Sequence, residues 1–274
     1  MNIILNFYRF IFCRPFFYVF NYHVFKLSLR GIGIFNSEGN DVTGERFFLH
    51  WLQKNNISIK TVFDVGANAG GYTMDVLHSF PKTKVFAFEP NPQTVSLFYK
   101  NIKNKNVLLE NTALGQKKKD ILLWDFADDA TLKHTQPTAT LASVHKEVVT
   151  KLHNQKAKSY KVKMTTVDDY VEMKNIKEID ILKIDTEGNE LEVVKGAKKI
   201  FKSGNVKILQ FEFNEMNAYS RSFLKDFYDL LPGYTFYRLM PYGLYPMGEY
   251  RPSTWELFAF QNIVALRTDV AKYV

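Results

Sequence analysis

The segment TVFDVGANAGGYT, residues 61–73, decides the fold. Its first five residues are mostly β-branched or aromatic, which is typical of a short buried strand. The chain then turns through Gly66 and Gly70, and residues 72–77 are predicted to form the helix that follows. A strand that turns on glycines into a helix brings backbone N–H groups close to a ligand. This segment therefore predicts a ligand site at a strand–helix turn.

An acidic residue at the end of a later predicted strand indicates which class of ligand binds. Residues 84–88, KVFAF, are predicted to form a strand that Glu89 ends, 19 positions after Gly70. In dinucleotide-binding folds, an acidic residue roughly 20 positions after the glycine loop accepts hydrogen bonds from ribose hydroxyls. The pair of features predicts a ribose-containing ligand.

Further elements extend this pattern along the chain. Strands are predicted at 107–109, 121–124, 161–163, 179–185, 206–213, 234–239 and 257–266, and helices at 43–52, 94–101, 166–171 and 223–231. Thr43 is the expected N-cap of the first of these helices. Asp185 ends a strand next in topology to the opening one, where ligands bind in open α/β sheets. The long polar tract 128–158 is predicted to be a substrate-specificity loop.

Composition and length describe a globular protein with a substantial core. The 274 residues are 46% hydrophobic and 23% charged, with a net charge of +8. That charge favours acidic partners such as phosphorylated lipids or anionic glycans, although a lysine-rich solvated surface explains it as well. We expect no nucleic-acid partner. Cys13 is the single cysteine, which excludes an internal disulfide or a cysteine-based zinc site and is consistent with a cytoplasmic location.

The first 30 residues are dense in Phe, Tyr, Ile and Leu, but Pro15 breaks any continuous helix. The longest unbroken apolar run, Pro15–Phe20, is far shorter than the roughly 20 residues needed to span a bilayer, and no signal peptide is predicted. We expect residues 1–35 to form a helical extension and residues 36–274 the main domain. The favoured prediction is that the extension packs on its own domain or on a partner in a homo-oligomer. The alternative is peripheral contact with the inner membrane surface.

Three motifs carry a family resemblance: VFDVGAN at 62–68, AFEPNP at 87–92 and DILKIDTEGNE at 180–190. Together with a Gly44-Glu45 pair, they resemble the FkbM family of S-adenosylmethionine-dependent methyltransferases, and the resemblance covers roughly residues 43–267. It implies an α/β Rossmann-like class I methyltransferase fold: a mostly parallel twisted sheet with an antiparallel terminal strand and helices on both faces. The residues that it implies for cofactor binding are Asp64, Gly66, Asn68, Gly70, Tyr72, Glu89, Asn91, Asn111 and Ala113.

The resemblance also implies O-methylation of a hydroxyl on a sugar, glycan, glycolipid or other small-molecule acceptor. Asp185 is the first candidate for the base or the acceptor-positioning residue, followed by Glu187 and Glu212. Asp185, Glu212 and Asn214 also offer oxygen ligands for a divalent metal, but we favour a reaction without metal. A nucleotide-linked oxidoreductase of the NAD type is the alternative enzyme, although it usually carries G-x-G-x-x-G, and position 68 here is Asn. A non-catalytic binding module of the same fold is the third hypothesis.

Overall fold

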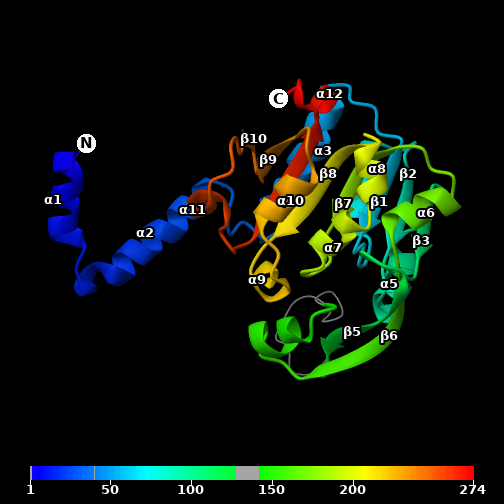
Figure 1. The fold of residues 1–274 in the computed structure, drawn as a ribbon, viewed down its shortest axis with the longest axis horizontal. Coiled ribbons are helices and arrows are strands. Elements are labelled where there is room, and N and C mark those ends of the chain that lie inside the picture. Colours follow the sequence, from blue (N-terminus) through cyan, green and yellow to red (C-terminus); the bar gives the residue numbers. More distant parts are fainter. Residues whose placement is uncertain (1, 40, 128–141) are drawn as a thin grey trace.

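The computed structural model describes residues 2–39, 41–127 and 142–274, and its centre is an eight-stranded sheet (Figure 1). Its strands are β1 Thr61–Val65, β2 Lys84–Phe88, β3 Val107–Glu110, β7 Ile179–Ile184, β8 Val206–Phe213, β9 Tyr234–Met240, β10 Gly243–Pro246 and β11 Gln261–Arg267. They lie in the order β10-β9-β11-β8-β7-β1-β2-β3. The five from β3 to β8 are parallel, and β11 runs antiparallel to both of its neighbours. The predicted mostly parallel sheet with an antiparallel terminal strand is confirmed, and β10 adds an antiparallel hairpin at the edge.

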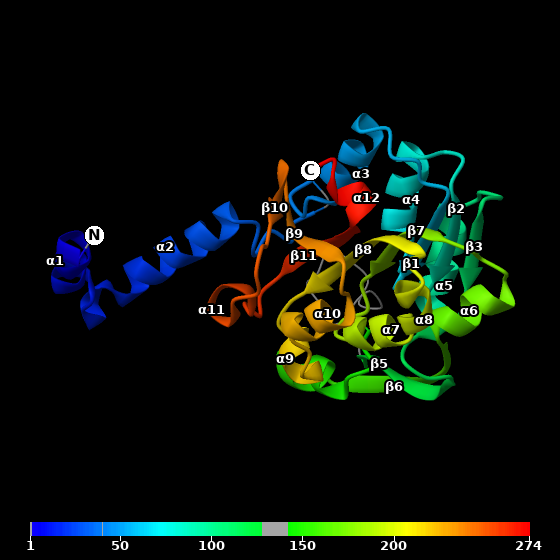
Figure 2. The same ribbon diagram turned by 45° about the horizontal axis from the view of Figure 1, so that its top comes forward.

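Helices cover both faces of this sheet, as predicted (Figure 2). Alternation along the strands explains this, because successive side chains point to opposite faces. Val62 packs with α3 (Glu45–Lys54), α4 (Gly71–Ser79) and α12 (Thr268–Ala271). Phe63 packs on the other face, with α6 (Val167–Met173), α7 (Glu190–Lys195), α8 (Lys198–Lys202) and α10 (Leu224–Leu230). The remaining helices of the main domain are α5 Pro92–Asn101, α9 Met216–Ser220 and α11 Pro252–Trp255.

A second, three-stranded sheet lies beside the first (Figure 1). It consists of β4 (Ala113–Leu114), β5 (Lys119–Phe126) and β6 (Ala157–Thr165), and β5 pairs antiparallel with β6 along its whole length. The strands predicted at 121–124 and 161–163 therefore exist, but they do not join the central sheet. Of the predicted specificity loop, residues 128–141 lie outside the described residues, and residues 148–152 form a short π-helix.

The N-terminal helices project from the body of the molecule (Figures 1 and 2). α1 spans Asn2–Phe12, a 3₁₀ turn spans Pro15–Phe17, and α2 spans Tyr18–Gly31. No residue of α1 is buried, and Leu29 is the one buried residue of α2. The prediction that these helices pack on their own domain is therefore wrong for α1 and for α2 up to Leu29, whereas packing on a partner in a homo-oligomer stays a prediction.

None of the described helices is by itself long and apolar enough to cross a membrane. The two helical stretches Asn2–Phe12 and Pro15–Gly31 are bent by 91° against each other. Only when they are taken together do they reach the length and apolar composition of a membrane span.

Most predicted boundaries shift by a few residues, and two of the shifts have a clear structural cause. The N-cap of α3 is Gly44 rather than Thr43, and its φ is +85°. A Cβ at position 44 would lie 2.8 Å from the Met240 carbonyl oxygen, so the chain passes too close to β9 for any side chain there. The last strand begins at Gln261 rather than Leu257, because residues 257–260 instead meet the end of the N-terminal extension, where Phe35 N–H donates to the Phe260 carbonyl at 2.8 Å.

Candidate active site

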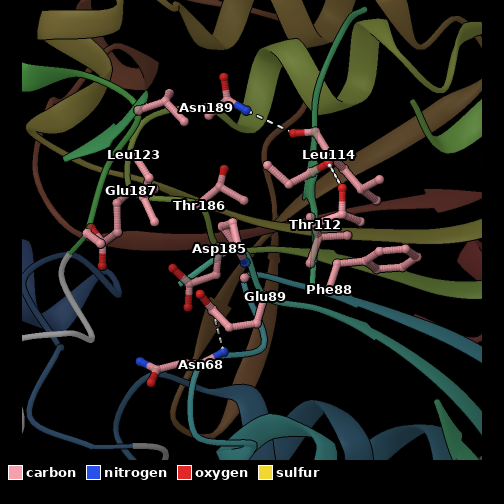
Figure 3. A pocket seen from close by; sticks show the side chains of 16 residues that line it. Asn68, Phe88, Glu89, Thr112, Leu114, Leu123, Asp185, Thr186, Glu187 and Asn189 are labelled. Atoms are coloured by element: carbon pink, nitrogen blue, oxygen red, sulfur yellow. Dashed lines mark hydrogen bonds between the residues drawn. The ribbon is translucent and has the colours of Figure 1, made fainter. Parts of the chain in front are cut away.

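A cleft lies at the carboxyl ends of β1, β2 and β7 (Figure 3). Its empty space, together with the solvent at its mouth, is about 650 Å³. The chain continues from β1 to β2 on one side and later places β7 on the other, so the cleft occupies the point where strand order reverses. Ligands of open α/β sheets bind at such points. The lining residues come from four turns and from the second sheet: Val65, Gly66, Asn68, Phe88, Glu89, Pro90, Thr112, Ala113, Leu114, Leu123, Ala142, Val144, Asp185, Thr186, Glu187 and Asn189.

Gly66 lets two strand ends meet at the floor of the cleft. Its φ is +79°, and a Cβ there would lie 1.7 Å from the Asp185 carbonyl oxygen. The Gly66 and Ala67 N–H groups both donate to the Phe88 carbonyl, at 2.9 and 3.0 Å, and Asp185 N–H donates to the Val65 carbonyl at 2.9 Å. Glycine at position 66 is therefore a steric requirement for placing Asp185 against the turn.

Glu89 is a buried carboxylate held by backbone donors. Its Oε2 accepts from the Asn68 N–H at 2.9 Å, and its Oε1 accepts from the Asn91 N–H at 2.7 Å. Burial raises the pKa of Glu89 to about 7, although these two N–H groups oppose the shift. The Asn111 side chain donates to the Glu89 and Pro90 carbonyls, at 2.8 and 3.1 Å, and so braces the turn from behind. Each carboxylate oxygen keeps a further lone pair that can accept from a ligand hydroxyl.

An apolar wall faces these polar groups. It is formed by Phe88, Leu114, Leu123 and Val144. Asn189 ties this wall to the β7–α7 turn, because its side chain donates to the Leu114 carbonyl at 3.0 Å (Figure 3). Leu123 and Val144 were not predicted as site residues, because no local sequence pattern indicates that the second sheet and the segment after residue 142 fold back over the cleft.

A row of buried polar residues crosses three strands below the cleft. Asp64 on β1, Lys183 on β7 and Gln210 on β8 are direct register neighbours, so they share one face of the sheet. Asp64 Oδ2 accepts from Thr73 Oγ1 at 2.6 Å, while Oδ1 is buried with no hydrogen-bond partner among the described residues. Lys183 Nζ donates to Asp185 Oδ2 at 2.9 Å, which connects the row to the cleft. Burial raises the pKa of Asp64, and the charge of Lys183 opposes that rise.

The row continues to Glu45 at the start of α3. Gln210 Nε2 donates to Glu45 Oε1 at 2.8 Å, and the Tyr72 hydroxyl donates to Gln210 Oε1 at 3.0 Å. Burial raises the pKa of Glu45 to about 7. Tyr72 thus lies on the face of the sheet that α3 and α4 cover, and it does not line the cleft. The predicted direct contact of Tyr72 with the cofactor is therefore corrected.

Three carboxylates gather around the end of β7. Asp185 and Glu187 line the cleft, and Glu212 lies near the end of the neighbouring strand β8. Burial raises the pKa values of Glu187 and Glu212 well above their usual range, and the charge of Asp185 adds to both shifts. Glu187 also has a φ of +55°, a left-handed conformation that is costly for a residue with a side chain. Ser143 Oγ donates to its carbonyl at 2.7 Å and helps to hold that conformation.

Glu190 shapes the turn instead of facing the cleft. Its Oε1 accepts from Thr186 N–H at 2.9 Å and from Gly188 N–H at 3.0 Å. Across residues 2–39, 41–127 and 142–274, no group of three or more His, Cys, Asp or Glu side chains has an arrangement that could hold a metal ion.

The structure brings half of the sequence-predicted site residues together in the cleft. Figure 3 shows Asn68, Glu89 and Asp185 close together at its centre, with Glu187 on one wall. The predicted residues that line the cleft are Gly66, Asn68, Glu89, Ala113, Asp185 and Glu187. Those that do not line it are Asp64, Gly70, Tyr72, Asn91, Asn111 and Glu212. Residues outside the cleft shape the turns that carry the lining residues. Asn91 caps α5 by accepting from Gln93 N–H at 3.0 Å. Gly70 leaves room for Ile102, whose Cδ1 would lie 2.4 Å from a Cβ at position 70.

Comparison with known proteins gives a consistent result. Residues 64–236 match the model of the FkbM methyltransferase domain. Methyltransferase 1 of Beauveria bassiana is 28% identical over 142 residues, which are 49% of this chain and 57% of that protein. The hexuronic acid methyltransferase AglP of Haloferax volcanii is 27% identical over 172 residues, which are 62% of this chain and 63% of that protein. The matches thus span less than two thirds of the length of these curated relatives.

Solved structures of low identity also align with the chain. The precorrin-6y C5,15-methyltransferase of Geobacter metallireducens aligns at 13% identity and a TM-score of 0.41, over 86% of this chain and 98% of that one. The plantazolicin methyltransferase BpumL in complex with SAH aligns at 9% identity and a TM-score of 0.40, over 93% of this chain and 92% of that one.

Proposed function

Because the chain belongs to the FkbM methyltransferase domain family, whose cofactor is S-adenosylmethionine, we propose that it methylates a hydroxyl of a sugar, glycan or glycolipid. The observation that carries this proposal is the cleft in which Glu89 and Asp185 lie together beyond the Gly66 turn. The sugar acceptor is supported by the hexuronic acid methyltransferase among the relatives.

The cleft has the chemistry that S-adenosylmethionine requires. When bound, this cofactor supplies a methyl group that is activated by the positive charge on its sulfur. Glu89 offers two acceptor oxygens to the ribose hydroxyls, and the apolar wall of Phe88 and Leu123 suits the adenine ring. The groups beneath the cleft favour a cation, because two acidic residues, Asp64 and Asp185, face the single basic group of Lys183.

Asp185 and Glu187 are the residues that we assign to the acceptor. The ion pair with Lys183 fixes the Asp185 carboxylate, so Asp185 is suited to orient the acceptor hydroxyl. Glu187 lines the cleft and burial raises its pKa, so its ionised carboxylate is a stronger base than an exposed glutamate, and we assign to it the hydroxyl proton that is released as the new carbon–oxygen bond forms. Glu212 lies outside the cleft, and the charges of Asp185 and Glu187 add to the burial that raises its pKa, so we assign it no direct role in the proton transfer.

Calorimetry with S-adenosylmethionine and NAD as separate ligands tests the cofactor site. The proposal requires binding of S-adenosylmethionine and none of NAD. Binding of NAD alone would favour the oxidoreductase hypothesis, and binding of neither would refute the site assignment.

Labelled methyl transfer to a uronic acid, a neutral sugar and their hydroxyl-blocked derivatives then tests the reaction. We expect transfer only to acceptors with a free hydroxyl. Cofactor binding without transfer to any hydroxyl acceptor would identify a binding module instead.

A further inference from the structure

The N-terminal helices expose an apolar surface that no other described part of the chain covers. The exposed fractions of Ile3, Phe10, Phe16 and Leu27 are 85%, 71%, 87% and 72%. Figures 1 and 2 show both helices standing clear of the main domain. Exposed apolar surface of this extent marks an interaction site.

The charge of this segment identifies the class of partner. Residues 1–37 contain no Asp or Glu, whereas they contain Arg9, Arg14, Lys26 and Arg30. Arg30 pairs with Glu38 at 2.5 Å, but the other three cations have no ion pair among the described residues. An apolar surface with positive charge and no negative charge complements a bilayer that contains anionic lipids.

The bend between the helices is built from specific contacts. Tyr8 donates its hydroxyl hydrogen to Asn21 Oδ1 at 2.7 Å, and Asn21 Nδ2 donates to the Phe12 carbonyl at 2.9 Å. The rings of Phe12 and Phe17 pack at 5.2 Å between centroids. These contacts satisfy the polar groups at the bend and leave the apolar side chains outside.

The geometry suits the surface of a bilayer better than its interior. α1 has 11 residues and α2 has 14, which correspond to about 17 and 21 Å at the usual rise of an α-helix. The hydrocarbon core is about 30 Å thick, so neither helix crosses it. Two short helices at a right angle can, however, both lie flat in the plane of the bilayer surface.

We propose that residues 2–31 bind in the interfacial layer of a membrane that contains anionic lipids, with the main domain in the water beside it. This proposal is independent of the methyl-transfer reaction, since it rests on no residue of the cleft.

Co-sedimentation of the full chain with vesicles tests the membrane proposal. Vesicles of phosphatidylcholine alone are compared with vesicles that also contain phosphatidylglycerol, and we expect at least tenfold tighter binding to the second kind. The combined variant Ile3→Ser, Phe7→Ser, Phe10→Ser should lose at least tenfold in vesicle affinity. Because these side chains are exposed, the fold should be unaffected.

A matched control removes equally exposed apolar groups from the main domain. Met173→Ser with Tyr242→Ser should leave vesicle binding unchanged. The variant Arg9→Gln, Arg14→Gln, Lys26→Gln should abolish the preference for anionic vesicles. A dimer that forms without vesicles and is broken by the serine variant would overturn the proposal in favour of a second copy of the chain. Absence of vesicle binding would also overturn it.

A different observation points to an anion site beside the start of the main domain. A groove there is lined by two arginines and one carboxylate, Arg238, Arg251 and Glu249, and by Tyr245 and Trp255, among others. Arg238 is only 2% exposed, and its guanidinium carbon lies 5.5 Å from the centroid of the Trp255 ring. Its Nε donates to Gln261 at 2.8 Å, whereas its Nη2 has no hydrogen-bond partner and the side chain no carboxylate partner among the described residues. A buried cation without a counter-charge is costly, so a ligand anion would stabilise it.

We infer that this groove binds a carboxylate or phosphate group, either of a soluble compound or of a lipid headgroup. Phosphorus NMR titration of the full chain with inorganic phosphate and with glycerol phosphate should show saturable binding. Vesicles with phosphatidic acid distinguish a lipid source when they are tested on the variant Arg9→Gln, Arg14→Gln, Lys26→Gln, in which the N-terminal helices no longer prefer anionic vesicles. Arg238→Met should abolish binding. Arg251→Gln should weaken anion binding severalfold. Because Arg251 lies at the exposed rim, this variant leaves the interior intact and serves as the test if Arg238→Met does not fold. Binding that both variants retain, or no saturable binding, would overturn this inference.

Discussion

Glu89→Gln removes one negative charge from the cleft at nearly unchanged side-chain volume, and we expect it to weaken S-adenosylmethionine binding about 10- to 100-fold. Hydrogen bonds to charged groups contribute about 1.5–3 kcal/mol each, and each 1.4 kcal/mol corresponds to a tenfold change in affinity. The Glu89 carboxylate now accepts from the N–H groups of Asn68 and Asn91 with its two oxygens.

The same substitution should also lower stability. Glutamine has one carbonyl oxygen, so one of these two buried N–H groups loses its acceptor and instead faces the NH₂ of the amide. An unsatisfied buried donor costs about 1–3 kcal/mol. For a protein of this size, we expect Tm to fall by about 2–4 °C for each kcal/mol lost.

Calorimetry at pH 6 and pH 8 is the assay. Because burial raises the pKa of Glu89 to about 7, the wild-type carboxyl is mostly protonated at pH 6 and mostly ionised at pH 8, and cofactor affinity should rise with pH across this range. The variant should show no such rise. Glu110→Gln is the matched control, since Glu110 ends the neighbouring strand and its Oε1 accepts a hydrogen bond from the Tyr170 hydroxyl at 2.9 Å, outside the cleft. Wild-type affinity in Glu89→Gln, or equal loss in the control, would refute the reasoning.

Three further predictions follow from the same residues. Gly66→Ala should destabilise the fold by about 3 kcal/mol or more in urea unfolding and abolish cofactor binding, because its Cβ would lie 1.7 Å from a carbonyl oxygen at a φ of +79°. Gly71→Ala is the control: a Cβ at position 71 has no atom within 4 Å, so this variant should be neutral or stabilising. Glu187→Gln should lower kcat by about 100-fold or more with little change in cofactor affinity, as steady-state kinetics would show, and an unchanged kcat would exclude it as the base. The pKa values of Glu45 and Glu89 rise from 4.5 to about 7 on folding, so their contribution to stability is complete below about pH 4.5 and is lost as the pH rises to about 7. Urea unfolding should therefore show a loss of up to about 3 kcal/mol per group across this range, and Glu45→Gln should remove its share.

The parts of the site that sequence predicted are those encoded locally. The composition of residues 61–65, the glycine turn and the strand-end position of Glu89 each depend on a few adjacent residues, and the structure places them as expected. The exact match of β8 to residues 206–213 has the same origin, because a run of apolar and β-branched residues is bounded by turn residues.

Contacts between distant segments could not be predicted in this way. Asp64, Lys183 and Gln210 become neighbours only through the register of three strands, and no local pattern reveals that register. The position of Leu123 over the cleft depends in turn on how β5 pairs with β6 in a separate sheet. The N-terminal helices show a related limit, because periodicity predicted that they are helical but not which surface they meet.

Transfer of a labelled methyl group from S-adenosylmethionine to a hydroxyl of a glycan or lipid acceptor tests the central claim most directly. We predict that the full chain labels such an acceptor, and that Glu187→Gln binds the cofactor but labels the acceptor about 100-fold more slowly. Failure of the full chain to bind the cofactor, or labelling by Glu187→Gln at the wild-type rate, would contradict the account.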